Sequence, residues 1–273
     1  MRDPHLTPPL VAIAHGSRDP RAGATVTELL GVAHERAPWL DARAAFLGHA
    51  PPSPLQVLTA LADREPAGPA PRASTVVLPL LLTAAFHSGT DIPALLDAAA
   101  ARLPGLRIRY GQPLGPHPGL LRALDRRLAE AGQDTGRGAR HTAVVLAAAG
   151  SSDPSANAVV ARVAAGWQAV QPAYASAGRP GPAEAVARLA RDGARRIVVA
   201  SYLLAPGLFA DRVREAALAA GAAAVSAPLG AAPEVADVLL DRYRQAAQAA
   251  AAAGGGPAAG APPARAGRWV SAR

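Results

Sequence analysis

The chain of 273 residues is an internal duplication. The run from Ile13 to Pro20 (IAHGSRDP) reappears from Ala147 to Pro154 (AAAGSSDP), with the Gly, Ser, Asp and Pro retained. A repeat on this scale predicts two similar units of roughly 120 residues each, which is an ordinary domain size. Whatever fold the first copy adopts must therefore also suit the second.

The two copies differ in their histidines. All seven histidines of the chain lie within the first 141 residues. Three of them have an apolar residue at the matched position of the second copy: His15 against Ala149, His87 against Phe209, and His117 against Ala232. A copy that keeps its turn-forming residues but loses one type of side chain predicts that this side chain does chemistry in the first half only.

Strand-like and helix-like patterns alternate along both copies. In the first copy they predict strands at 10–14, 41–47, 75–82 and 107–110, and helices at 22–36, 54–61, 92–102 and 118–131. In the second they predict strands at 143–148, 171–176, 196–200 and 223–226, and helices at 157–167, 182–192, 210–220 and 233–248. Such alternation is typical of a parallel sheet with helices on both faces.

The predicted fold class is therefore α/β, with two tandem, duplicated Rossmann-like domains and a cleft between them. We place the N-terminal, catalytic domain at residues 1–134 and the degenerate repeat at 141–248. Residues 249–273 are rich in Ala, Gly, Pro and Arg, and we expect a disordered tail there.

His15 and His87 are the best candidates for chemistry. Each follows a predicted strand on its carboxyl side, which is the edge where ligands bind in open parallel sheets. Neutral imidazole binds Fe, Co, Ni and Zn, and it also transfers protons near neutral pH. We predict that these two residues are both the metal ligands and the catalytic groups.

Other polar residues near this edge have competing interpretations. His117 follows the fourth strand, and either substrate contact or loop structure explains it. Ser17 is suited to capping the next helix or to contacting an anionic group. A hydrolase using Ser17 as nucleophile is disfavoured, because no Gly-x-Ser-x-Gly elbow surrounds it and Ser151 persists in the second copy.

Two further polar residues are assigned by comparison with the second copy. Arg18 is replaced there by Ser152, so a carboxylate-binding role in the first half is open to it. Asp91 precedes Ile92-Pro93 and is expected to be a helix N-cap.

Composition excludes several classes of protein. Cysteine is absent, so disulfides and thiolate metal ligands are excluded. The net charge is +8 and every basic residue is Arg, which either reflects a GC-rich gene or serves to attract a polyanionic ligand. Scattered Arg and only 4% aromatic residues argue against nucleic acid binding. No apolar stretch is long enough to span a membrane and no Walker A motif is present, so we expect a cytoplasmic protein that does not use ATP.

Two motifs together resemble a known family. His15-Gly16-Ser17-Arg18, and Phe86-His87 leading to Asp91-Ile92-Pro93 after an apolar strand, are similar to class II chelatases of the sirohydrochlorin cobaltochelatase/ferrochelatase type. The resemblance covers roughly residues 10 to 248. In the two-half members of this family the metal-binding histidines lie in the N-terminal half, and the histidines of this chain have the same asymmetric distribution.

The resemblance implies a lyase, a metal chelatase that inserts Co²⁺ or Fe²⁺, with Ni²⁺ also possible, into a sirohydrochlorin-like tetrapyrrole. The pathway would be siroheme or cobalamin synthesis, without ATP and with no cofactor beyond the substrate metal. In this interpretation Phe86 contacts the macrocycle, while Ser17, Arg18 and His117 bind the substrate. A monomer is expected, because both halves of the cleft lie in one chain.

The sequence departs from the family at one position. Family members often have Glu after Phe-Leu at the end of the second strand, whereas here Phe46-Leu47 is followed by Gly48 and His49. His49 is a possible substitute for the missing carboxylate. The departure also keeps open an alternative, a non-catalytic protein that binds or delivers the metal or the tetrapyrrole.

Overall fold

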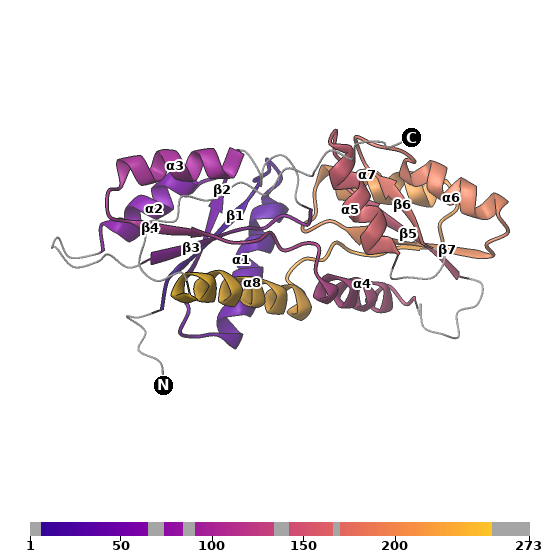
Figure 1. Cartoon of the computed structure of the whole chain (residues 1–273). Helices are drawn as coiled ribbons and strands as arrows, with labels where there is room; N and C mark the ends of the chain where they lie inside the picture. Colours follow the sequence, from indigo (N-terminus) through magenta and orange to yellow (C-terminus); the bar gives the residue numbers. More distant parts are fainter. Residues whose placement is uncertain (1–6, 65–73, 84–90, 134–141, 166–169, 253–273) are drawn as a thin grey trace, which may run out of the picture.

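Two parallel sheets side by side form the frame of the molecule (Figure 1). The computed structural model describes residues 7–64, 74–83, 91–133, 142–165 and 170–252. The first sheet has the order β2-β1-β3-β4 and the second the order β6-β5-β7-β8, and every strand pair is parallel. The α/β class and the tandem duplication are thus confirmed.

The first half contains β1 (Leu10–Ala14), α1 (Pro20–Arg36), β2 (Ala42–Phe46), α2 (Pro54–Ala62), β3 (Ser74–Pro79), α3 (Ile92–Arg102), β4 (Arg107–Tyr110) and α4 (Pro118–Glu130). The second half contains β5 (Thr142–Ala148), α5 (Pro154–Ala164), β6 (Val170–Tyr174), α6 (Pro182–Arg191), β7 (Arg196–Tyr202), α7 (Leu208–Ala219), β8 (Ala224–Val225) and α8 (Pro233–Ala252). These bounds lie within a few residues of those predicted from the sequence.

The differences from the predicted bounds have local causes. Helix α1 begins at Pro20 rather than residue 22, because the Asp19 side chain caps it and proline is favoured in the first turn. Strand β3 ends at Pro79 rather than at residue 82, where its pairing with Ile13 of β1 also ends. Helix α8 continues to Ala252, so residues 249–252 are helical, and residues 253–273 lie outside the described part of the chain.

Alternation along the strands divides the interior into three cores. In β1, Leu10 and Ala12 belong to a central core, whereas Val11 and Ile13 belong to an outer core under α2 and α3. The second half has its own outer core under α6 and α7. The central core is continuous, because residues of both sheets contribute to the same cluster.

The helices that end the two halves lie on each other's sheets. Helix α8, from the end of the second half, packs on α1 and on strands β3 and β4 of the first. Helix α4, from the end of the first half, packs on α8 and on β7 of the second (Figure 1). The two halves therefore share their interior rather than meeting only at a surface. No helix in the described part of the chain is long and apolar enough to cross a membrane.

Candidate active site

The turn after β1 carries His15 and is built by the residues around it. Gly16 has φ +87°, a left-handed conformation that favours glycine. A Cβ atom at this position would lie 1.8 Å from the carbonyl oxygen of Gly48. The Gly48 amide donates a hydrogen bond to the His15 carbonyl oxygen over 3.2 Å. The turn is thus held against the loop that follows β2.

Helix α1 starts immediately after this turn, through a chain of short hydrogen bonds. The Ser17 hydroxyl oxygen accepts a hydrogen bond from the Asp19 amide over 3.0 Å. The Asp19 carboxylate then caps α1 by accepting from the Arg21 amide over 2.9 Å. The sequence-based suggestion that Ser17 itself caps the helix is wrong, because its hydroxyl stabilises the residue that does so.

The second copy repeats this turn without the imidazole. Gly150 has φ +83°, the Ser151 hydroxyl oxygen accepts from the Asp153 amide over 3.1 Å, and Asp153 caps α5. Ala149 occupies the position of His15. The geometry of the turn therefore does not depend on the imidazole.

His15 lines a cavity of about 150 Å³ at the carboxyl edge of the first sheet. Both halves contribute to the cavity. The first half supplies the strand ends, one face of α1 and the chain just past β3, and the second half supplies the chain just past β7. The lining residues are Ala14, His15, Gly16, Ala22, Val26, Phe46, Leu80, Leu81, Leu204 and Ala205. An exposed imidazole thus stands at an otherwise apolar wall.

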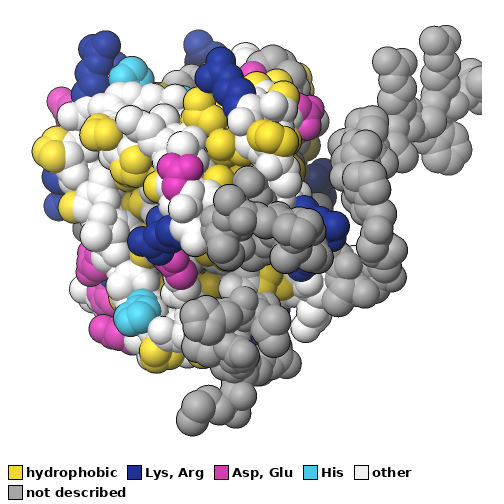
Figure 2. Space-filling view, turned by 90° about the vertical axis from the view of Figure 1, so that its left-hand side faces the viewer, with side chains coloured by type: hydrophobic (Ala, Val, Ile, Leu, Met, Phe, Trp, Pro, Cys, Tyr) yellow, Lys and Arg dark blue, Asp and Glu magenta, His cyan; other side chains and the backbone are white. Residues whose placement is uncertain are grey.

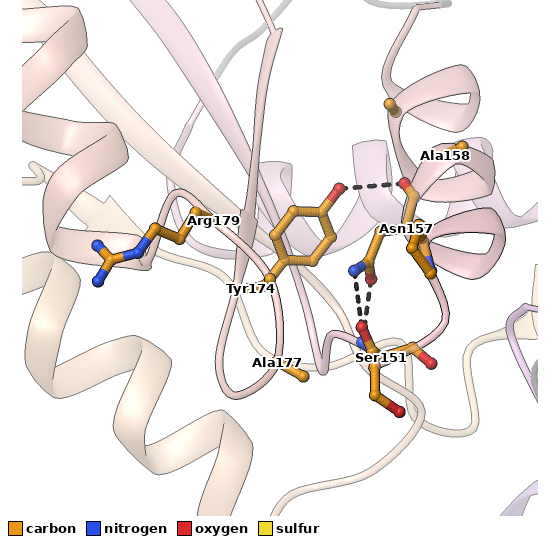
Figure 3. Close-up of a pocket in the computed structure, with 10 residues that line it drawn as sticks. Ser151, Asn157, Ala158, Tyr174, Ala177 and Arg179 are labelled. Carbon is orange, nitrogen blue, oxygen red and sulfur yellow. Dashed lines mark hydrogen bonds between the residues drawn. The ribbon is translucent and has the colours of Figure 1, made fainter.

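A larger cavity, of about 390 Å³, lies in the second half beside the matched turn (Figure 3). Three of its polar residues are bonded to one another. The Asn157 side chain pairs with both the amide and the carbonyl of Ser151, and the Tyr174 hydroxyl donates to the Asn157 carbonyl oxygen over 3.0 Å. Its lining, within the described part of the chain, contains no histidine. Despite its size, it is less suited to metal chemistry than the cavity beside His15.

The other predicted site residues are placed as follows. Arg18 is exposed on the turn next to His15. His49 is exposed, with φ +65°, in the loop that touches Gly16, so it lies at the same edge of the sheet. Phe86 and His87 lie outside the described residues. Among the residues that are described, no three His, Asp or Glu side chains are grouped to hold a metal.

His117 is the N-cap of α4. Its Nδ1 atom accepts a hydrogen bond from the Gly119 amide over 3.0 Å. Burial lowers the pKa of His117, and the nearby positive charge of Arg242 lowers it further. The neutral ring is therefore the form that caps the helix. Loop structure, one of the two explanations open from the sequence, accounts for this residue, and its contact with substrate stays a prediction.

Asp91 does not behave as predicted. The expected N-cap has helical backbone angles, φ −71° and ψ −46°, and its side chain makes no capping hydrogen bond to α3. An N-cap residue normally has an extended backbone that turns its side chain toward the first free amides. The helical conformation of Asp91 prevents this.

Sequence reasoning missed two contacts between the halves beside the cavity. Arg21 Nη2 lies 2.6 Å from Asp19 Oδ2 and 2.7 Å from Asp211 Oδ2, so it joins the start of α1 to the start of α7. The Tyr202 hydroxyl donates to the Leu82 carbonyl oxygen over 2.9 Å. Both contacts join residues more than 100 positions apart, and no local pattern signals them.

Charge on the outside is mixed. On the end of the molecule shown in Figure 2, formed by the first half, basic and acidic side chains are interspersed. Several Arg residues are engaged in ion pairs with carboxylates, including Arg43 with Asp41 and Arg126 with Glu234. The excess of Arg therefore does not form one continuous positive field on this face.

Comparison with known proteins identifies a single family. A family model described as CbiX matches residues 9–131 and 143–246. A sirohydrochlorin cobaltochelatase of Priestia megaterium is 28% identical over 217 residues, covering 77% of this chain and 69% of that protein. A sirohydrochlorin ferrochelatase of Bacillus subtilis (strain 168) is 30% identical over 181 residues, covering 63% and 68%. The solved structure of SirB from Bacillus subtilis with Fe³⁺ has a TM-score of 0.74 at 25% identity, covering 90% and 98% of the two chains.

Proposed function

Because this chain belongs to the CbiX family, we propose that it is a metal chelatase that inserts Co²⁺ or Fe²⁺ into sirohydrochlorin, in siroheme or cobalamin synthesis. The observation that carries the proposal is the place of His15. Its imidazole stands at the carboxyl edge of the first sheet, beside an apolar cavity walled by both halves. The matched position of the second half is Ala149, so the halves are alike in fold and unlike in chemistry.

Metal insertion replaces two pyrrole N–H protons of the macrocycle with one divalent ion, and two protons leave. A neutral imidazole suits both parts of this exchange, since it binds the incoming ion and accepts a proton near neutral pH. We assign these roles to His15 together with His87. His49 lies at the same edge and is our candidate for the part that a carboxylate plays elsewhere in the family.

The cavity beside His15 is smaller than most ligand sites, which span roughly 300–1,000 Å³. A cavity of about 150 Å³ has no room for a whole tetrapyrrole, so we propose that only one edge of the ring enters it. The rest of the macrocycle, with its carboxylates, would extend toward the exposed side, where Arg18 provides a guanidinium. We keep Ser17, Phe86 and His117 as further substrate contacts to be tested.

The same proposal includes the metal partner, the oligomeric state and the location of the protein in the cell. The substrate metal is the only inorganic partner that we assign, and imidazole ligands would also accept Ni²⁺. Since α4 and α8 already cover the apolar faces between the sheets, we propose a monomer. A chain without cysteine suits a reducing cytoplasm, which is where we place it.

The decisive experiment is a metal-by-metal insertion assay on sirohydrochlorin, followed by the absorbance change of the macrocycle. We expect turnover with Co²⁺ or Fe²⁺, and a loss of at least about 100-fold in kcat for His15→Ala and His87→Ala. His34→Ala is the control, because His34 is exposed in the last turn of α1, away from the sheet edge. A protein that only binds would instead saturate at one equivalent without turnover, and equal rates in all three variants would refute the assigned site.

A further inference from the structure

A buried tyrosine hydroxyl joins the two halves behind the cavity. Tyr202 is the last residue of β7, and only 2% of it is exposed. Its hydroxyl donates to the carbonyl oxygen of Leu82, in the first half, over 2.9 Å. Burial raises the pKa of the Tyr202 phenol, so the group stays protonated and remains a donor throughout the neutral range.

The chain segments around this hydrogen bond are closely packed. A Cβ atom on Gly115 would lie 2.0 Å from the Leu82 carbonyl oxygen and 2.7 Å from the Tyr202 hydroxyl. The Gly115 amide also donates to the Leu81 carbonyl oxygen over 3.1 Å. Three segments therefore meet at this point, namely the chain leaving β3, the chain leaving β7 and the loop before α4.

This junction holds both walls of the cavity. Leu80 and Leu81, which line it from the first half, directly precede Leu82. Leu204 and Ala205, which line it from the second half, follow closely after Tyr202. The hydrogen bond therefore ties together the two strand ends whose separation sets the width of the cavity.

The hydrogen bond from Tyr202 to Leu82 breaks the symmetry between the two halves. Equivalent positions of the two halves follow from the strand pairing, because Leu10 pairs with Val76 in the first sheet as Val144 pairs with Val198 in the second. Val76 is thus equivalent to Val198. With the same spacing, Leu80 is equivalent to Tyr202 and Leu82 to Leu204. The symmetric counterpart of the bond would need a donor at position 80, where leucine has none. The hydroxyl thus holds the chain that leaves β3, in the half that carries His15, whereas the matched carbonyl oxygen, that of Leu204, accepts a hydrogen bond from the Gly230 amide over 2.8 Å.

We propose that Tyr202, although it belongs to the degenerate half, is a positioning residue for metal insertion. Its hydroxyl holds the two walls of the cavity at the separation that places the macrocycle against His15. This inference rests on the proposed chelatase function. A small displacement of bound reactants reduces the rate of a reaction far more than it reduces the stability of the fold.

The chain offers a matched control. Tyr174 is also buried, at 6% exposure, and its hydroxyl also donates to a backbone carbonyl oxygen, that of Asn157, over 3.0 Å. That bond lies within the second half, at the larger cavity (Figure 3). Tyr202→Phe and Tyr174→Phe each remove a hydroxyl that donates to a backbone carbonyl oxygen, one between the halves and the other at the edge of the larger cavity.

The test compares the two variants in insertion of Co²⁺ into sirohydrochlorin, in thermal unfolding and in binding of Co²⁺ alone, followed by its visible absorption. We expect both variants to lose thermal stability, Tyr202→Phe more than Tyr174→Phe because its hydroxyl is more deeply buried. We expect kcat to fall about tenfold for Tyr202→Phe and to stay unchanged for Tyr174→Phe, with binding of Co²⁺ alone unaltered in both. A stability role alone would lower the unfolding temperature without this difference in kcat.

Equal kcat values in the two variants would overturn the inference, as would a loss of Co²⁺ binding that accounts for the whole loss of rate. His15→Ala separates this outcome from failure of the proposed function. If the unaltered protein turns over and His15→Ala does not, equal rates for the two Tyr variants refute only the role of Tyr202. If the unaltered protein does not turn over, the chelatase proposal itself fails.

Discussion

Single atoms decide the geometry of the turn that carries His15. Gly16 is required there twice, once by its left-handed backbone and once by the 1.8 Å that would separate a Cβ atom from the Gly48 carbonyl oxygen. The atom that such a Cβ would meet belongs to the backbone of Gly48, which cannot move away as the end of a long side chain can. In the proposed function His15 does the chemistry, and Gly16 determines where the His15 side chain is placed.

Gly16→Ala should therefore destabilise the protein. We expect a loss of more than about 2 kcal/mol in the free energy of unfolding, measured in urea, together with loss of activity. Gly31→Ala is the control, because Gly31 is exposed within α1 and a Cβ atom there meets nothing within 4 Å. That variant should gain about 0.5–1 kcal/mol from better helix propensity. Equal effects of the two substitutions would contradict this account of the turn.

His117 should make stability depend on pH. Its neutral ring caps α4, and its pKa in the folded state is lowered by burial and by Arg242. The unfolded chain therefore takes up a proton first, near a pKa of about 6.5. The stabilisation is complete above that pH and is lost as the pH falls from about 6.5 toward the lower pKa of the folded state.

His117→Asn tests this dependence, because asparagine caps a helix without titrating. At pH 7.5 we expect a thermal midpoint close to that of the unaltered protein. Between pH 7 and 5.5 the unaltered chain should lose more stability than the variant, since only it has this group to protonate. Parallel curves for the two proteins would show that the cap does not titrate in this range.

At the scale of elements, most of the architecture was predictable. The alternation of strand and helix, the repeat, and the position of His15 past the first strand all follow from local patterns of apolar residues and turns. The exchange of α4 and α8 does not. An apolar stripe shows that a helix is covered on one face, but it does not say which sheet covers it, and the two sheets of a duplication offer similar surfaces.

An ion pair between α1 and α7 links the two halves and should hold the start of α7 in place. Arg21 joins Asp19, which caps α1, to Asp211 in the first turn of α7. The Arg21 side chain is half exposed, so we expect Asp211→Asn to leave the unfolding temperature almost unchanged. The start of α7 should nevertheless open more often, because its link to the first half is gone.

Amide hydrogen exchange measures that opening. We expect exchange in the first turn of α7 to become several-fold faster in Asp211→Asn at low salt, and the difference to shrink at high salt, where the ion pair is already screened. Asp41→Asn is the control, since Asp41 pairs with Arg43 and Arg64 within the first half. Unchanged exchange in α7, or an equal change in the control, would show that the ion pair does not hold the helix.

At the scale of the whole molecule, the shared central core couples the halves. Leu120, Leu124 and Leu128 of α4 are completely buried in a cluster that includes strand residues of both sheets. Helix α8 covers the first sheet in return. Each half thus depends on a helix or a sheet of the other to bury its apolar face, which is a reason for a degenerate copy to persist after it has lost its histidines.

This coupling predicts that the protein unfolds as one unit. Leu124→Ala, in a helix of the first half that lies over the second sheet, should cost about 2–5 kcal/mol. Exchange of the slowest amides in β1 and in β5 should accelerate by the same factor, and calorimetry should show one transition whose measured enthalpy equals the van't Hoff value. Faster exchange in β5 with β1 unaffected, or two resolved transitions, would mean that the halves fold separately. The cavity beside His15 would then join two independent bodies, and its width would vary with their relative motion instead of being set by the core that they share.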